Sequence, residues 1–216
     1  MNTNPNAVRV LCFGDSNTWG YVSGRDHDRL SSDKRWPGVL QKLLGTQYEV
    51  IEEGLNARTI STKDPRPDKP GRKTTEYVFA CLDTHDPLDW VILMLGTNDC
   101  KNAYHLAPER ISLRMSRLLQ RIKEHKPHSK KEHPQIMLIS PPLIHEVPDY
   151  WNVLDKYLGA AVKSRRIGAL YEQIAAKLRI QFLDSAPIAV PGVDGVHITE
   201  KGHRRLAEEI ARKVKG

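Results

Sequence analysis

The sequence predicts an α/β fold in which a five-stranded parallel sheet lies between two layers of helices, a three-layer sandwich. Short apolar runs alternate with longer segments of helical periodicity along the whole chain. The most apolar run, residues 89–95, is continuous rather than alternating, which is typical of a parallel strand covered on both faces. No repeat, linker or change of composition is visible. We therefore expect residues 1–216 to form a single domain.

The expected strands are short, apolar and bounded by residues that favour turns. The first is a β-branched run that stops at Gly14, and the fourth stops at a serine followed by two prolines. Each is followed by a segment long enough to cross back over the sheet, as parallel neighbours require. The five ranges are 8–13, 48–52, 89–95, 135–139 and 180–183.

The expected helices carry apolar residues on one face. Pro108 suits the first turn of one helix, Thr199 suits the cap of the last, and a single long helix is expected to follow Pro148. Residues 35–44 and 74–82 form the other two helices, and charged surface loops are expected at 21–34 and 64–72. The apolar positions of the later helices are Ile111, Met115, Leu118 and Ile122, then Ile167, Leu170, Ile174 and Leu178, then Leu206, Ile210 and Val214.

The net charge of +7 raises the question of a nucleic-acid or membrane partner. No recognisable nucleic-acid motif is present, and the positive charge is scattered rather than gathered in one recognition element. The densest basic patch, residues 123–133, is interpreted as a solvated loop. Its three histidines lack an accompanying set of ligands, so we expect no functional metal site there. They are His125, His128 and His133.

No apolar run approaches the roughly 20 residues of a membrane span, and residues 1–7 are polar and leave no room for a signal peptide. We therefore expect a cytoplasmic protein without a membrane partner. Three cysteines distant in sequence, Cys12, Cys81 and Cys100, argue for reduced thiols rather than a disulfide framework.

The polar residues Asp15, Ser16, Asn17 and Thr18 directly follow the first expected strand. Open parallel sheets place their chemistry at the carboxyl ends of strands, so a serine here is a candidate nucleophile. The alternative is that Ser16 or Thr18 only caps a helix. A phosphate- or nucleotide-binding module of the same fold also remains open, although no glycine-rich fingerprint or phosphate-loop lysine supports it.

Two later stretches favour the catalytic interpretation. Gly96-Thr97-Asn98-Asp99 follows the third expected strand, and Asp194-Gly195-Val196-His197 precedes the last helix. With Gly14-Asp15-Ser16-Asn17 they form an ordered set that resembles the SGNH (GDSL-type) hydrolase family, and in particular its arylesterase and acyltransferase branch. Further similar blocks, such as RWPGVL and IEEGLNART, spread the resemblance over nearly the whole chain. It implies a flavodoxin-like fold with strand order 2-1-3-4-5.

The resemblance implies a serine hydrolase in which Ser16 is the nucleophile and His197 the general base. Of nine histidines, His197 alone lies three residues after an aspartate in a turn that opens a helix. Asp194 is the expected partner of the imidazole, because that spacing lets both side chains converge within one turn. Asp184, after the fifth strand, is the competing carboxylate.

The resemblance also implies an oxyanion hole made of the Ser16 N–H, the Asn98 side chain and a third donor. The third donor comes from residues 52–59, where Ala57 stands in the place of the family's usual glycine, and Gly54 is the alternative. Substrate contacts are expected from Trp19, Tyr21 and Thr97, although Trp19 could equally serve the core.

These expectations predict an esterase that acts on small aryl or short-chain esters through an acyl-enzyme, with possible transfer of the acyl group to alcohols. No cofactor or metal is called for. A carbohydrate deacetylase or thioesterase of the same family is the alternative. The expected partners are a small-molecule ester and further copies of the chain in a homo-oligomer, with no nucleic acid.

Overall fold

A five-stranded parallel sheet forms the centre of the protein, in a computed structural model that describes residues 2–126, 128–129 and 132–216. The strand order is β2-β1-β3-β4-β5, which confirms the predicted topology. Because the order reverses direction next to β1, the carboxyl ends of β1 and β3 open a crevice at that edge. The strands are β1 (Val8–Gly14), β2 (Tyr48–Gly54), β3 (Trp90–Met94), β4 (Gln135–Ile139) and β5 (Gln181–Leu183).

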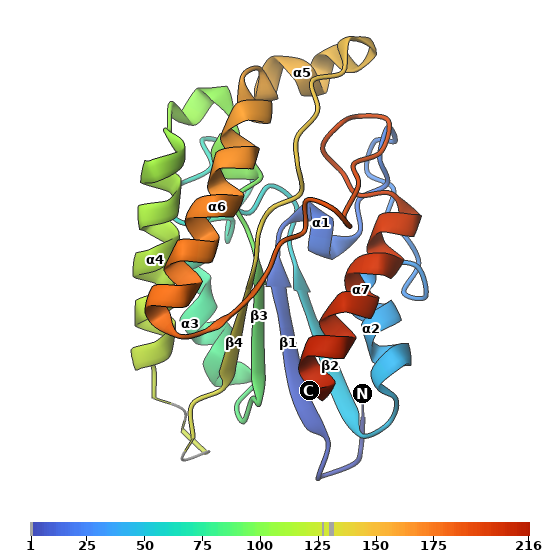
Figure 1. The fold of residues 1–216 in the computed structure, drawn as a ribbon, viewed down its shortest axis with the longest axis vertical. Helices are drawn as coiled ribbons and strands as arrows, with labels where there is room; N and C mark the ends of the chain where they lie inside the picture. The colour runs from blue at the N-terminus through green and yellow to red at the C-terminus, as the bar shows by residue number, and fades with distance from the viewer. Residues whose placement is uncertain (1, 127, 130–131) are drawn as a thin grey trace.

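Helices cover both faces of the sheet, with α3, α4 and α6 on one side and α2 and α7 on the other (Figure 1). In the described part of the chain, no helix is both long enough and apolar enough to cross a lipid bilayer. The helices are α1 (Ser16–Trp19), α2 (Trp36–Leu44), α3 (Thr74–Thr84), α4 (Pro108–Glu124), α5 (Trp151–Tyr157), α6 (Ala160–Leu178) and α7 (Glu200–Lys215), with short 3₁₀ turns at Asn98–Cys100, Asn102–Tyr104 and Pro148–Tyr150.

Each central strand divides its side chains between two apolar cores, because successive residues of a strand point to opposite faces. Leu11 and Phe13 enter the core beneath α3, α4 and α6, whereas Val10 and Cys12 enter the core beneath α2 and α7. All five residues of β3 are buried. The continuous apolar run therefore marks a strand covered on both sides, as expected.

The single long helix expected after Pro148 is wrong, because the structure divides it into α5 and α6. Leu158 leaves the helical region, with φ −57° and ψ 127°, and Gly159 has φ +80°. Glycine adopts this left-handed conformation without steric cost, so the chain turns sharply at this point. As a result, α5 lies over the edge where the strands end (Figure 1).

Other boundaries differ by one or two residues. β1 and β2 run on to Gly14 and Gly54, which pair in register at the end of the ladder. The two predicted helix starts are confirmed: Pro108 is the first residue of α4, and the Thr199 side chain accepts the Gly202 N–H at 3.1 Å.

The basic patch is partly helix, since α4 continues to Glu124. Within it, Pro127, Lys130 and Lys131 lie outside the described residues. His125 Nε2 lies 2.6 Å from Asp83 Oδ1, and His128 Nε2 lies 3.4 Å from the same oxygen. The three cysteines are free, as predicted, and all three are buried.

We predict that Gly54→Ala lowers the free energy of unfolding by about 1–3 kcal/mol, the usual cost of overpacking. A Cβ at Gly54 would lie 2.3 Å from the Trp19 nitrogen and 2.6 Å from the Trp19 Cα, and these backbone atoms cannot move aside as a flexible side chain could. Urea unfolding measures the change. Gly168→Ala is the matched control, because its nearest atoms lie 3.8 Å away and alanine favours helix. Equal losses in the two variants would contradict the prediction.

Candidate active site

Ser16 lies where the fold predicts chemistry, directly after β1 and at the first position of α1 (Figure 1). The Asp15 side chain caps this short helix by accepting the Asn17 N–H at 2.9 Å. As the first residue of the helix, Ser16 has a backbone N–H with no intrahelical acceptor. The Ser16 hydroxyl and its backbone N–H therefore both lie at the N-terminus of α1, next to the end of β1.

His197 joins Ser16 to Asp194 in one line of hydrogen bonds. His197 Nδ1 lies 2.7 Å from Asp194 Oδ2, and Nε2 lies 3.1 Å from Ser16 Oγ. A carboxylate can only accept, so Nδ1 carries the proton and Nε2 is left to accept from the serine hydroxyl. This is the arrangement of a nucleophile, a base and a group that orients the base.

Asp194 is held as an anion by the turn that carries it. Its Oδ1 accepts the Val196 and His197 N–H groups at 3.0 and 2.9 Å, and its Oδ2 accepts the Gly24 N–H at 3.2 Å. Burial alone would raise the pKa of Asp194, but the hydrogen bond and charge of His197 and these backbone donors hold it well below its usual range. The carboxylate is therefore charged wherever His197 can become an imidazolium.

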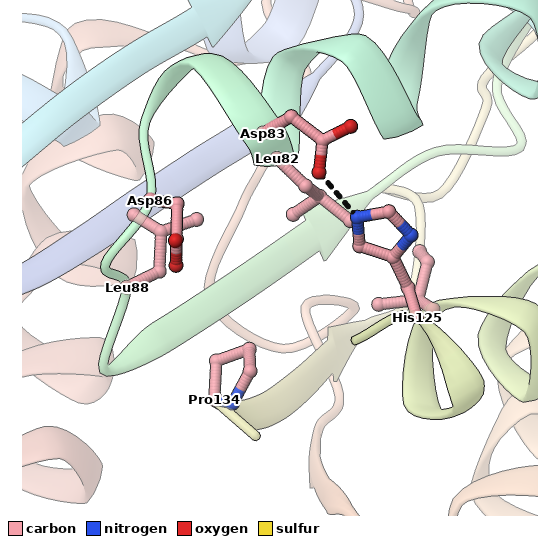
Figure 2. Close-up of a pocket in the computed structure, with 7 residues that line it drawn as sticks. Leu82, Asp83, Asp86, Leu88, His125 and Pro134 are labelled. Carbon is pink, nitrogen blue, oxygen red and sulfur yellow. Dashed lines mark hydrogen bonds and ion pairs between the residues drawn. The ribbon is translucent and has the colours of Figure 1, made fainter. Parts of the chain in front are cut away.

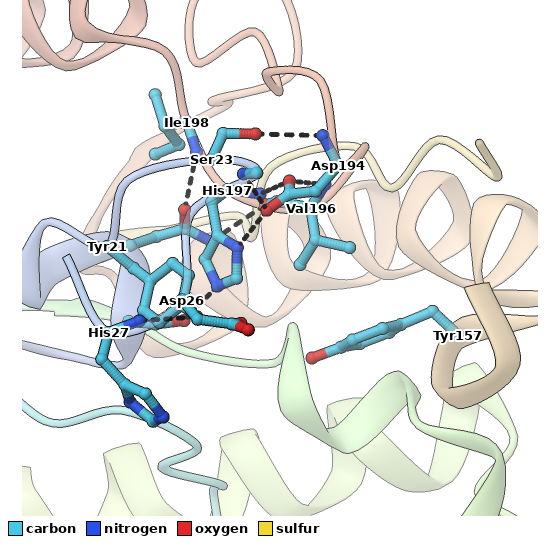
Figure 3. A network of polar contacts seen from close by, with 12 residues as sticks. Tyr21, Ser23, Asp26, His27, Tyr157, Asp194, Val196, His197 and Ile198 are labelled. Carbon is cyan, nitrogen blue, oxygen red and sulfur yellow. Dashed lines mark hydrogen bonds and ion pairs between the residues drawn. The ribbon is translucent and has the colours of Figure 1, made fainter. Parts of the chain in front are cut away.

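Tyr21 packs flat against His197, with ring centroids 4.2 Å apart and an angle of 25° between the planes. Figure 3 shows the imidazole between this ring and Asp194, with Tyr157 pointing toward the site from α5. Ser23 lies on the same loop as Tyr21, and its Oγ accepts the Asp194 N–H at 3.0 Å. The charged loop 21–34 thus braces both members of the pair.

Asn98 lies in the 3₁₀ turn after β3, and its amide is fixed at both ends. Its Nδ2 donates to the Arg58 carbonyl at 3.0 Å, and its Oδ1 accepts the Tyr157 hydroxyl at 3.2 Å. Because an amide nitrogen carries two hydrogens, one remains to donate to a third group.

Ala57 has φ +64°, in the left-handed region that glycine adopts freely and alanine resists. Among the described residues, none accepts a hydrogen bond from its N–H. The neighbouring Arg58 is buried and anchors this turn: Nη1 donates to the Gly14 and Glu53 carbonyls, and the guanidinium lies 4.1 Å from the Phe13 ring centroid. Burial lowers the pKa of Arg58 to about 10. Gly54, the alternative donor, pairs with Gly14 at the end of the β1–β2 ladder.

Three other candidates lie apart from this line of contacts. Asp184 accepts the Ser140 hydroxyl at 2.9 Å and the Ala186 N–H at 3.1 Å, which is a turn-capping role. Thr97 is buried next to Asn98. Trp19 packs under Arg29, whose guanidinium lies 4.9 Å from its ring. A cavity beside His197, described next, has neither Thr97 nor Trp19 among its described lining residues.

A cavity of about 500 Å³ opens beside His197. Tyr21 and His197 form one wall, while Tyr150 and Trp151 contribute aromatic surface and Asp26, Asp149 and Asn152 contribute polar groups. A second hollow, shown in Figure 2, lies between α3 and the end of α4 around Asp83 and His125. At about 20 Å³ it has room for little more than one water molecule.

One group in the described part of the chain has ligand atoms close enough together for a metal ion: Glu53, Cys81 and His85. The Glu53 carboxylate already lies 3.1 Å from His85 Nε2 and accepts the Tyr77 hydroxyl at 3.2 Å. Burial also raises the pKa of the Cys81 thiol to about 12, which opposes metal binding at neutral pH.

A model of the GDSL-like lipase/acylhydrolase family matches residues 12–205 of the chain. The chain belongs to this family. The match confirms the resemblance noted in the sequence and the prediction of an ester-hydrolysing enzyme.

Two solved structures of related proteins are similar over nearly their whole length. An aryl esterase from M. smegmatis is 38% identical, with a TM-score of 0.89, and the match covers 97% of this chain and 99% of that one. A carbohydrate acetylesterase from Sinorhizobium meliloti is 34% identical, with a TM-score of 0.88 and coverages of 96% and 98%. An acetylxylan esterase from Xylanibacter ruminicola is 26% identical over 97% of this chain, which spans only 43% of that longer relative.

Some residues of this GDSL-like site were not predicted from the sequence. Ser23 and Gly24 lie in a loop that charge alone marked as surface, and nothing in the local pattern around Tyr157 links it to Asn98. Asn17 bridges the nucleophile helix and the histidine turn, donating to the Val196 carbonyl and accepting the Ile198 N–H. Only Asn17 and Arg58 carried a signal, since both lie in the family-like blocks.

Two further carboxyl groups lie buried beneath the site. Burial raises the pKa of Asp15 to about 6 and that of Asp99 to about 7. The Asp99 carboxylate accepts the Ile60 N–H, whose nitrogen lies 3.1 Å from Oδ2. These groups make the stability of the folded chain depend on pH.

We predict that Asp99→Asn flattens this dependence. An aspartate in the unfolded chain has a pKa of about 3.9. Between about pH 4 and pH 7, Asp99 in the folded chain therefore keeps a proton that it has lost in the unfolded chain. Stability therefore falls as pH rises through this window, whereas asparagine keeps an acceptor for Ile60 without a charge. Urea unfolding from pH 5 to pH 8 should show the variant gaining on the wild type as pH rises. Parallel profiles would contradict the prediction.

Proposed function

We propose that this protein is a serine esterase that cleaves small carboxylic esters through an acyl-enzyme intermediate. The support is the hydrogen-bonded line from Ser16 through His197 to Asp194, at 3.1 and 2.7 Å. In this proposal Ser16 is the nucleophile, His197 the general base and then the general acid, and Asp194 the orienting carboxylate.

The first half of the reaction acylates the serine. Ser16 Oγ attacks the ester carbonyl carbon while its proton moves to His197 Nε2, and the carbonyl π electrons move to oxygen. When the tetrahedral intermediate collapses, the C–O bond to the alcohol breaks and the alcohol leaves with the proton from Nε2. Asp194 stabilises the imidazolium in between. Water repeats the sequence and regenerates Ser16, and an added alcohol in its place would receive the acyl group.

The developing oxyanion needs donors aimed at it in advance. We assign this role to the Ser16 N–H, the second hydrogen of Asn98 Nδ2 and the Ala57 N–H. The assignment of Ala57 rather than Gly54 rests on two observations. No described residue accepts a hydrogen bond from the Ala57 N–H, and the bond between Asn98 and the Arg58 carbonyl ties the two donor segments together.

Esters of acetylated carbohydrates are the second candidate substrate. The cavity beside His197 combines the Trp151 and Tyr150 rings with the Asp26 and Asp149 carboxyl groups. Aromatic faces and hydrogen-bond acceptors together suit a sugar, and two of the similar proteins are a carbohydrate acetylesterase and an acetylxylan esterase. Aryl esters remain the first choice, as in the aryl esterase relative.

We also propose a homo-oligomer in the cytoplasm. Exposed apolar side chains gather on α5 and the start of α6, with Trp151 66%, Leu158 59% and Val162 71% exposed. Such a patch favours burial against another protein surface.

We predict that Ser16→Ala lowers turnover of p-nitrophenyl esters by about 10⁴-fold or more, because only binding and oxyanion stabilisation remain. The assay uses acyl chains of increasing length, with and without added alcohol, and a fluorophosphonate probe should label the wild type at Ser16 only. Asp194→Asn should also be severely impaired, and Asp184→Asn is the matched control. Flat rates on every ester, probe labelling in the variant, or a greater loss in Asp184→Asn would each overturn the assignment.

We predict that Asn98→Ala lowers kcat by about 10²–10³-fold with little change in KM, since its donor matters once charge develops on oxygen. Asn102→Ala is the control, because Asn102 bonds the Asp155 carbonyl instead. Ala57→Gly keeps its N–H and should retain activity while gaining up to about 1 kcal/mol of stability from relief of the left-handed strain. Ala57→Pro is not a suitable test of the N–H, because proline locks φ at about −65° and could not adopt the left-handed conformation of Ala57. A large loss of kcat in Ala57→Gly would contradict this account.

A further inference from the structure

Four arginines form a stripe along α4. Arg110, Arg114, Arg117 and Arg121 are separated by four, three and four residues. Each directly precedes a member of the apolar stripe that α4 buries, at positions 111, 115, 118 and 122. Since both series follow the helical repeat, the basic stripe runs beside the buried one. The expectation of scattered positive charge is therefore wrong for this helix.

The four arginines line one hollow of about 290 Å³. Its other walls include the Ser61 and Thr75 side chains and the apolar Leu113 and Leu118, and no carboxylate is among its described lining residues. This lining shares no residue with the cavity beside His197. It is a separate feature of the surface.

Few carboxyl groups compensate the guanidinium groups of this hollow among the described residues, although Arg114 acts electrostatically on the buried Asp99 carboxyl group. None of the four forms an ion pair with another described residue. Arg114 donates to the Thr62 hydroxyl, and Arg121 lies 4.4 Å from the Phe79 ring centroid. Like charges one helical turn apart repel each other. An anion in the hollow would remove this repulsion.

We propose that this hollow is a binding site for a chain of linked phosphate groups, as in triphosphate. The planar guanidinium fork pairs with phosphate oxygens two at a time, and the Ser61 and Thr75 hydroxyls can donate to further oxygens. From Arg110 to Arg121 the helix advances about 16 Å, which favours several linked anionic groups over one. Single-stranded nucleic acid fits less well, because bases stack on aromatic rings and no aromatic residue lines the hollow.

The experiment is titration of the purified full chain with inorganic triphosphate, followed by calorimetry at about 0.15 M salt. We expect saturable binding of one triphosphate per chain, with inorganic phosphate binding much more weakly. Arg110→Gln with Arg117→Gln should weaken binding at least about tenfold, since each removes a charge-assisted hydrogen bond. Both side chains are exposed, and neither forms a hydrogen bond or ion pair with another described side chain, so the fold and basal ester hydrolysis should be unchanged.

The matched control is Arg204→Gln with Arg205→Gln on α7, which removes the same charge from another exposed surface. It should leave triphosphate binding unchanged. Equal losses in the two double variants would mean that binding follows net charge alone and would overturn the site. Absence of binding, or an oligonucleotide binding at this hollow more tightly than triphosphate, would overturn it as well.

Discussion

The two hydrogen bonds of the Asn17 side chain hold the two ends of the sequence together at the candidate active site. The amide donates to the Val196 carbonyl at 3.3 Å and accepts the Ile198 N–H at 2.9 Å. The helix of Ser16 is thereby fixed to both sides of His197. A strand end and a turn about 180 residues later need such a cross-link, because a small misplacement of reacting groups costs a large factor in rate.

A second constraint comes from the turn after β2, where Ala57 is held in a left-handed conformation. Such a residue persists only where its surroundings fix it. Here Arg58 supplies the restraint through the Gly14 and Glu53 carbonyls, the Phe13 ring and its own carbonyl to Asn98. A buried cation and a strained turn both cost stability, so this segment is ordered by the packing around it rather than by its local preferences.

Periodicity predicted the sheet and most helices, because burial on one or both faces leaves a clear pattern in the sequence, whereas the strand order came from the resemblance to a known family. Periodicity did not predict the break between α5 and α6 at Gly159. Apolar residues keep a helical spacing on both sides of this glycine, and a single glycine is tolerated inside a helix. Ser16, Asn98 and His197 were found through short blocks at strand ends and turns. The three-residue spacing already favoured Asp194 over Asp184 as the neighbour of His197. The contacts of Tyr157 and Ser23, which reach the site from other segments, required coordinates. The arginine stripe has a periodic signal in the sequence, which the density of charge along the chain does not reveal.

The three carboxyl groups around Ser16 are all buried, but they differ in how many hydrogen bonds they accept. Asp15, at pKa about 6, and Asp99, at about 7, are deeply buried with few hydrogen bonds, so their charged forms are disfavoured. Asp194 is buried as well, yet it accepts three backbone N–H groups and the imidazole, which hold its pKa low. Environments that push the pKa values of neighbouring carboxyl groups apart assign them different roles. Among the carboxyl groups of the described residues, Asp194 combines a low pKa with direct contact to His197. In the proposed mechanism it is therefore the group that stabilises the imidazolium as it forms.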